Sequence, residues 1–136
     1  MIQHETYTRV RYAETDQMGY AYHGNYVQYF EIGRTEILRE LGFPYSKMEK
    51  DSVLCPVMSM QFRFLRAAMY DDVIRICTEI RKMPDDKVTF HHELFNEKGK
   101  LLCAGSVKLA FVTKEERKRC QVPEDLRKEM EGRFVD

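Results

Sequence analysis

One long stretch of the chain, residues 25–41, carries apolar residues at helical spacing. Successive apolar positions are four, three, four and four residues apart, and polar residues fall on the opposite side. This pattern predicts an amphipathic helix about 25 Å long. Asn25 is a typical N-cap, while Gly42 and Pro44 are typical of a helix end. The apolar side consists of Tyr26, Phe30, Gly33, Ile37 and Leu41.

Alternating apolar and polar residues predict strands on both sides of this helix. Residues 5–12 predict a first strand with one solvated face. Turn-forming residues at 84–86 and 97–99 predict that the last strands form an antiparallel meander, and residues 122–126 predict a short final helix. The strands predicted after the long helix cover Val53–Arg66, Asp72–Lys82, Lys87–Asn96 and Lys100–Thr113. Within the last three strands, the residues that share a face are Ile74, Ile76, Thr78 and Ile80, then Val88, Phe90, His92 and Leu94, then Leu101, Cys103, Gly105, Val107, Leu109 and Phe111.

This order of elements predicts an α+β fold, with an antiparallel sheet of about five strands and one helix on its apolar face. One helix covers such a wide face incompletely, and the sheet has unpaired edges. We therefore expect a homo-oligomer in which strands pair edge to edge and substrates lodge at the seam between subunits. Gly33 costs about 1 kcal/mol relative to Ala in mid-helix, which indicates a close approach of the helix to the sheet.

The length and charge of the chain limit the classes of function. The 136 residues suit a single domain spanning 1–136 that folds without disulfides or a structural metal. The 22 basic and 22 acidic side chains cancel, which argues against a nucleic-acid partner. The N-terminus lacks the features of a signal peptide, and no window is apolar enough to span a membrane. We expect a cytoplasmic protein that acts on a small molecule.

The cysteines and histidines do not form a metal-binding pattern. The cysteines lack metal-ligand spacing and predict small buried thiols. His91 and His92 are neighbours on a predicted strand and point to opposite faces, so neither is assigned to a metal. We expect neither a metal nor a cofactor. The cysteines are Cys55, Cys77, Cys103 and Cys120.

The most informative part of the chain is residues 11–26, which set Asp16 seven residues before His23 at the predicted helix start. The glycines of this stretch allow tight turns, so the first unpaired N–H groups of the helix could point at a polarised oxygen close to the acid. This arrangement indicates chemistry on a carbonyl. Taken singly, Asp16 also suits a turn-former, and His23 suits a packing or capping residue. Glu14 is expected to be a solvated loop carboxylate.

Three segments together resemble a known family: the core Thr-Asp-x-x-Gly-x-x-x-His-x-Asn-Tyr at 15–26, Phe-Glu-x-Gly-Arg at 30–34 and Val-Pro-Glu-Asp-Leu at 122–126. They resemble the 4-hydroxybenzoyl-CoA thioesterase family of hot-dog-fold acyl-CoA thioesterases, over nearly the whole chain. The resemblance implies a hot-dog fold, in which the sheet wraps around one long central helix. It also implies a homodimer or homotetramer, and hydrolysis of an acyl-CoA thioester to a free carboxylic acid and CoA without a metal.

The resemblance also implies roles for residues of the motif. Asp16 takes the place of the catalytic acid, which either attacks the thioester carbonyl or activates a water, and the sequence does not separate these routes. The backbone N–H of His23 takes the place of the group that polarises the carbonyl, and its imidazole could orient the substrate or water. Tyr22, Asn25 and Tyr26 are the neighbouring substrate-binding candidates, although Asn25 is expected to cap the helix whatever the function.

The phosphates of CoA require basic partners. Lys87 and Arg119 align with basic residues that contact the nucleotide in the resembling family, although each suits a solvated surface charge equally well. Where the family pairs Lys with Ser, this chain has Val88, which weakens that part of the match. For the acyl pocket, Tyr22 and Tyr26 are candidates, together with Met58 and Met60, for which core packing is the simpler role.

Two other functions remain compatible with the same residues. One is a non-catalytic module that binds acyl-CoA or an acyl-carrier protein, which the acid in the motif disfavours. The other is a hot-dog dehydratase acting on a hydroxyacyl thioester, which the spacing of the motif disfavours. The preferred acyl group, and the choice between a CoA and a carrier-protein thioester, depend on pocket depth and are not readable from the sequence.

Overall fold

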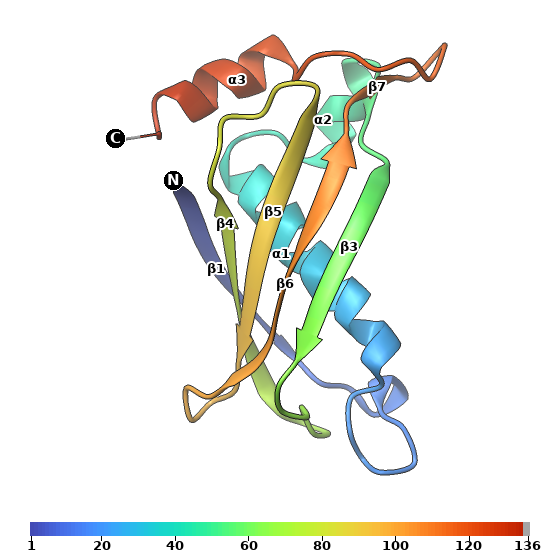
Figure 1. Ribbon diagram of the computed structural model, residues 1–136, viewed down its shortest axis with the longest axis vertical. Coiled ribbons are helices and arrows are strands. Elements are labelled where there is room, and N and C mark those ends of the chain that lie inside the picture. The colour runs from blue at the N-terminus through green and yellow to red at the C-terminus, as the bar shows by residue number, and fades with distance from the viewer. Residues whose placement is uncertain (135–136) are drawn as a thin grey trace.

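A five-stranded antiparallel sheet curves around one long helix in the computed structural model, which describes residues 1–134 (Figure 1). The strand order is β1-β4-β5-β6-β3, so β4, β5 and β6 form the predicted meander. The strands of this sheet are β1 (Ile2–Arg9), β3 (Val57–Phe64), β4 (Val73–Ile80), β5 (Lys87–Phe95) and β6 (Leu101–Ala110). The other elements are α1 (Tyr26–Glu40), α2 (Tyr45–Lys50), α3 (Glu124–Glu131), the short pair β2 (Val53–Leu54) and β7 (Val112–Thr113), and two 3₁₀ turns (Tyr12–Glu14 and His23–Asn25).

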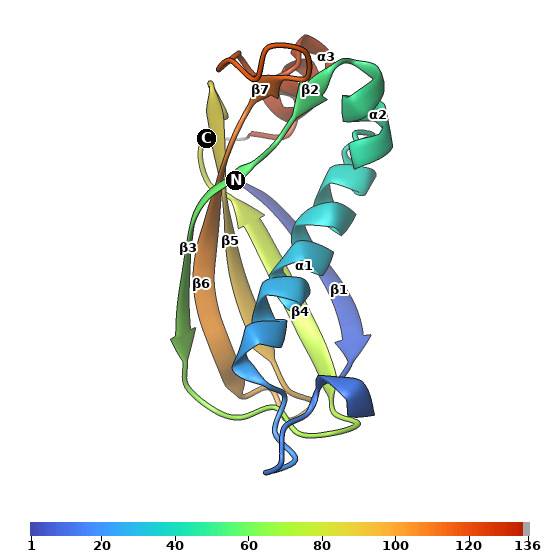
Figure 2. The same ribbon diagram turned by 90° about the vertical axis from the view of Figure 1, so that its right-hand side faces the viewer.

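Helix α1 runs along one face of the curved sheet, as Figure 2 shows. Its boundaries agree with the prediction, and all five predicted apolar positions are buried. At Gly33 the backbone touches the sheet: an added Cβ would overlap the Thr78 hydroxyl and lie 2.8 Å from Ile76 Cγ2 and 3.0 Å from His92 Nδ1. The predicted close approach is therefore confirmed, and a glycine is required at this point of contact.

The predicted inward faces of the meander are confirmed by the strand register. Thr78 pairs with His92 across β4 and β5, and His92 pairs with Gly105 across β5 and β6. These three residues form one row of the inner face beneath Gly33. A shift of register between Leu94 and Phe95 displaces Leu101 from the pattern. The core consequently lies between α1 and the central strands.

Several predicted strand boundaries are wrong. The first strand covers Ile2–Arg9 rather than 5–12, because residues 12–14 turn into a 3₁₀ helix. The segment 53–66 is two strands, β2 and β3, separated by Cys55 and Pro56; Pro56 lacks the N–H that a continuous ladder needs. The segment 100–113 is likewise divided into β6 and β7, since β2 pairs with β7 away from the main sheet.

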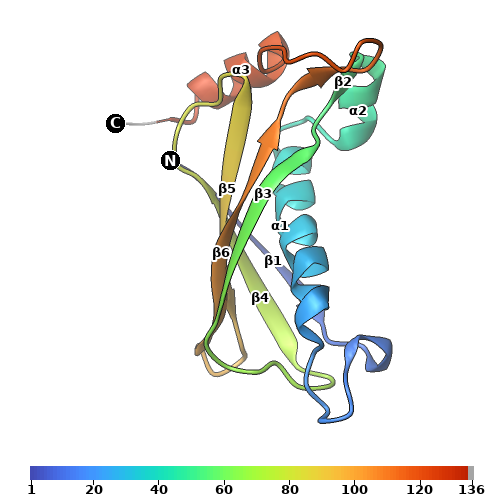
Figure 3. The ribbon, with the colours of Figure 1, turned by 45° about the vertical axis from the view of Figure 1, so that its right-hand side comes forward.

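The two ends of the molecule differ in character. Figure 3 shows α2, α3, β2 and β7 gathered at one end, with the loop between β1 and α1 at the other. The final helix was predicted, whereas α2 was not.

Among residues 1–134, no helix is long and apolar enough to cross a membrane. Of the four cysteines, Cys103 is fully buried as predicted, and the other three are only partly buried.

Strand β3 forms an open edge of the sheet and is exposed on both faces. Val57 and Met58 are 46% and 49% exposed, and Phe64 and Leu65 at the far end are 52% and 45% exposed. The expected packing of Met58 in the core is wrong for this chain, while Met60 packs partly against the core. Apolar side chains along a free strand edge are typical of a surface that another chain covers.

Candidate functional site

The loop between β1 and α1 holds Asp16 in a tight turn. Its Oδ1 accepts hydrogen bonds from the N–H groups of Met18, at 2.9 Å, and Tyr20, at 3.2 Å. Gly19 has φ +78°, a conformation that favours glycine and lets the chain reverse within this turn. The turn-forming role of Asp16 is thus present, but it uses one carboxylate oxygen. That contact fixes the direction in which the carboxylate points.

The segment after β3 anchors the Asp16 loop from the other side. The N–H of Ala21 donates to the carbonyl of Ala68 at 2.7 Å, and the N–H of Tyr70 donates to the carbonyl of Gly19 at 3.1 Å. The hydroxyl of Tyr26, on the first turn of α1, accepts the N–H of Ala68 at 3.4 Å. No local sequence pattern predicts these contacts, because the two segments lie about 50 residues apart in the sequence.

His23 begins the 3₁₀ turn that leads into α1. As the first residue of that turn, it has no acceptor for its N–H within the turn. Its exposed ring packs against Tyr22, with the ring centroids 4.3 Å apart, and meets Phe64 edge-on at 6.5 Å. The helix start therefore presents an N–H without an acceptor in its own turn, beside an aromatic wall.

Asp16, His23 and Tyr26 line one open groove of about 330 Å³. Its other wall is the end of β3 and the residues that follow, 64–67. Tyr26 is 3% exposed, and burial raises the pKa of its hydroxyl. The groove therefore combines a carboxylate, a helix start and an apolar wall, a combination that suits a polarised carbonyl attached to an apolar group.

Asn25 and Glu14 behave differently from prediction. Asn25 occupies the N-cap position, but its side chain makes no capping hydrogen bond. Because the residues before it already follow a helical turn, its Nδ2 instead donates to the Glu14 carbonyl at 2.6 Å. The expectation that Glu14 is a solvated carboxylate is wrong: it is 6% exposed, and Tyr29 and Arg11 bond its oxygens. Tyr22, by contrast, is 49% exposed beside the groove.

Lys87 and Arg119 lie at the same end of the sheet, and neither lines the groove. Arg119 pairs with Asp86 at 3.0 Å, next to exposed Lys87 at the start of β5. The groove lies at the opposite end of the sheet, where Phe64 pairs with Cys103 and Cys103 with Leu94. The eight residues from Lys87 to Leu94 span about 23 Å of strand. A single chain does not bring the predicted phosphate contacts to the predicted acid.

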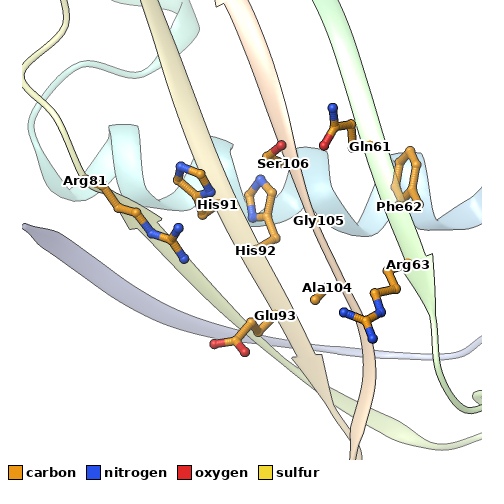
Figure 4. A pocket seen from close by; sticks show the side chains of 10 residues that line it. All are labelled: Gln61, Phe62, Arg63, Arg81, His91, His92, Glu93, Ala104, Gly105 and Ser106. Atoms are coloured by element: carbon orange, nitrogen blue, oxygen red, sulfur yellow. The ribbon is translucent and has the colours of Figure 1, made fainter.

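A second hollow, of about 420 Å³, lies on the face of the sheet away from α1 (Figure 4). His91, Glu93 and Arg81 line it, and neither Asp16 nor His23 does. Partial burial, and then the charge of Arg81, lower the pKa of His91. His92, the next residue, is buried beneath α1, so the prediction that these histidines face opposite sides is confirmed. Residues 1–134 contain no cluster of three or more His, Cys, Asp or Glu side chains that could hold a metal.

Comparison with known proteins gives concordant matches. The model of a family described as the thioesterase-like superfamily matches residues 10–130. YneP of Bacillus subtilis is 38% identical over 82% of this chain and 81% of its own length. YbgC of Escherichia coli O157:H7, an acyl-CoA thioester hydrolase, is 33% identical over 76% of this chain and 78% of its own. The structure of a DHNA-CoA thioesterase from Staphylococcus aureus superposes with a TM-score of 0.85 and 35% identity, covering 89% of this chain and 81% of that one.

Proposed function

This chain belongs to the thioesterase-like superfamily, and we propose that it hydrolyses an acyl-CoA thioester to a free carboxylic acid and CoA. Membership confirms the resemblance noted in the sequence and the hot-dog fold. The observation that carries the proposal is the groove in which the Asp16 carboxylate and the start of α1 lie together. The names of the relatives supply the substrate class, acyl-CoA, that we transfer to this chain.

The chemistry needs few groups, because a thioester carbonyl is electrophilic and a thiolate is a tolerable leaving group. With Oδ1 of Asp16 engaged by two N–H groups, Oδ2 is the oxygen left to act. It either attacks the carbonyl to form a mixed anhydride that water then hydrolyses, or takes a proton from the attacking water. In both routes the C–S bond breaks, the thiolate of CoA leaves and acquires a proton, and the N–H of His23 donates to the carbonyl oxygen as negative charge develops there.

Thiol release from a panel of acyl-CoAs tests the proposal. We expect hydrolysis by the wild type and a loss of kcat of about 10²-fold or more for Asp16→Asn. Asp125→Asn, on the exposed face of α3, is the matched control and retains wild-type kcat. Equal rates for wild type and Asp16→Asn would refute the role of Asp16. A wild type that binds acyl-CoA but releases no thiol would favour the binding module instead. Trapping with hydroxylamine separates the two routes, since only direct attack labels Asp16.

The open edge of β3 supports assembly of two or more copies of this chain, with the groove completed at the seam. The apolar side chains that flank this edge, Met58 among them, are exposed in the single chain. We expect Met58→Glu to weaken the assembly, because it puts a charge into a surface that pairing would bury. Light scattering during size-exclusion chromatography gives the mass. A wild type of monomer mass over the micromolar range contradicts this expectation, and Val27→Glu, at an exposed apolar site on α1, is the control.

Lys87 and Arg119 can bind the nucleotide of CoA only if they reach the groove of another copy of the chain. About 23 Å of strand separates Lys87 from the groove of its own chain. We expect Lys87→Glu to raise KM for acyl-CoA about tenfold, the loss of one charge-assisted contact. KM for the same acyl group on N-acetylcysteamine, which lacks phosphates, stays unchanged. The control is Lys50→Glu, on the exposed side of α2. An equal KM increase for both substrates would show that Lys87 does not contact phosphate.

A further inference from the structure

We propose that Glu14 is a positioning residue for this hydrolysis, holding the Asp16 loop in place against the start of α1. The inference rests on the proposed function and adds to it a residue that does not line the groove. Glu14 lies two residues before Asp16, within the 3₁₀ turn at 12–14. It is one of four buried polar or charged residues in the part of the chain that the structure describes.

The side chain of Glu14 joins the loop to α1. Its Oε1 accepts the Tyr29 hydroxyl at 2.9 Å and the N–H of Arg11 at 3.0 Å. Its Oε2 accepts a hydrogen bond from Nε of Arg11 at 3.1 Å and forms an ion pair with Nη2 of the same guanidinium, also at 3.1 Å. Tyr29 is fully buried at the end of the first turn of α1, so this bond ties the loop to the buried face of the long helix. Hydrogen bonds to a carboxylate are among the stronger ones in proteins.

The backbone of the same residue provides the second connection. The Glu14 carbonyl accepts the N–H of Tyr22 at 2.8 Å and Nδ2 of Asn25 at 2.6 Å. Tyr22 precedes the 3₁₀ turn that presents the N–H of His23, and Asn25 is the last residue of that turn. Glu14 consequently contacts residues on both sides of the proposed oxyanion donor, while Asp16 follows it two residues later along the chain.

The electrostatics favour a structural connection over proton transfer by Glu14 itself. Oε1 already accepts two hydrogen bonds and Oε2 accepts one from Nε of Arg11, while the guanidinium of Arg11 neutralises the charge of the carboxylate. Burial, and then the contact with Glu14, raise the pKa of the Tyr29 hydroxyl, which therefore stays a neutral donor in any ordinary assay. Asp16 differs, because in the described part of the chain only its Oδ1 accepts hydrogen bonds. The two carboxylates of the motif have separate tasks.

Loss of this connection should affect the rate more than binding, because a displacement of about 1 Å at a reacting group can cost about 10²-fold. We expect Glu14→Gln to lower kcat about 10²-fold, since its amide would point N–H groups at the donors of Arg11. Tyr29→Phe removes one bond to the same carboxylate and should lower kcat about tenfold. KM for acyl-CoA should change less than about threefold in both variants, because neither residue lines the groove.

A double-mutant cycle tests the coupling to Asp16. Rates of thiol release are normalised to folded protein by circular dichroism for the wild type, Glu14→Gln, Tyr29→Phe, Asp16→Asn and the two double variants. If Glu14 acts through Asp16, neither substitution lowers the residual rate of Asp16→Asn further. Glu129→Gln, which also removes a carboxylate paired with an arginine, is the control and keeps wild-type kcat.

Distinct results overturn the inference and the proposed function. Wild-type kcat in both Glu14→Gln and Tyr29→Phe, with Asp16→Asn inactive, overturns the inference alone. The inference alone is also overturned if these substitutions lower kcat by the same factor in the wild type and in Asp16→Asn. That result would indicate a general effect on the fold. A wild type without thioesterase activity, or an Asp16→Asn variant with full activity, overturns the proposed function and this inference with it. Should Glu14→Gln fail to fold, Tyr29→Phe decides the outcome by the same criteria.

Discussion

Lowering the pH should destabilise this protein through one buried histidine, His92. The side chain is 1% exposed on the inner face of β5, where its Nδ1 lies 2.9 Å from Thr78 Oγ1 and its ring packs 4.5 Å from Phe30. Burial lowers the pKa of His92 to about 3, and the charge of Arg34 adds to that shift. Nε2 is also buried and has no hydrogen-bond partner among residues 1–134. The folded protein therefore keeps this imidazole neutral.

The size of the effect follows from the two pKa values. In the unfolded chain the pKa of His92 is about 6.5, so below that pH the unfolded state holds one more proton than the folded state. The free energy of unfolding then falls by about 1.4 kcal/mol per pH unit, from about pH 6.5 down to the folded pKa of about 3. The contribution of His92 to the free energy of unfolding has its full value at pH 7.5, and about 2 kcal/mol of this contribution is lost by pH 5. That loss is a large fraction of a typical total of about 5–15 kcal/mol.

Urea unfolding of the wild type and His92→Asn, at fixed protein concentration and several pH values, measures this contribution. Circular dichroism is the suitable signal because the chain has no Trp. The free energy of unfolding of the wild type should fall by about 2 kcal/mol relative to the variant between pH 7.5 and 5. His91→Asn is the control, because His91 is only partly buried and should contribute less. A difference between wild type and His92→Asn that stays constant with pH would refute the reasoning.

Other predictions concern packing and thiol chemistry. Gly33→Ala should lower the free energy of unfolding by about 2 kcal/mol in a urea titration, because overpacking against Thr78 and Ile76 outweighs the better helix propensity. Gly132→Ala, whose added Cβ would meet only Glu129 O at 3.8 Å, should be neutral, and equal effects would contradict this reasoning. Burial raises the pKa of Cys103 to about 11 and that of Cys55 to about 12. Iodoacetamide at pH 8 should therefore alkylate Cys120 before either of them, as peptide mass spectrometry would show; faster alkylation of Cys103 would indicate that the core opens.

The local pattern of the sequence determined the elements that depend on periodicity. Helix α1 was predicted within one residue at each end, and the buried faces of β4 and β5 were predicted residue by residue. These features follow from which side chains face the core, and that is encoded within a few neighbouring positions. The spacing from Asp16 to His23 was also sufficient to indicate carbonyl chemistry at a helix start. The resemblance carried by the same motif then indicated the thioester.

Contacts between distant segments were decided only by the tertiary structure. Glu14 was expected in solvent, yet Tyr29 and Arg11 enclose it once α1 packs beside the loop. Lys87 and Asp16 looked like parts of one site, but the length of β5 puts them at opposite ends of the sheet. Neither result is visible in a local pattern, because each depends on which segments pack together after the chain folds. The sequence thus singled out Asp16 as the candidate acid, and the packing of α1 on the sheet decided that Glu14, two residues before it, is buried.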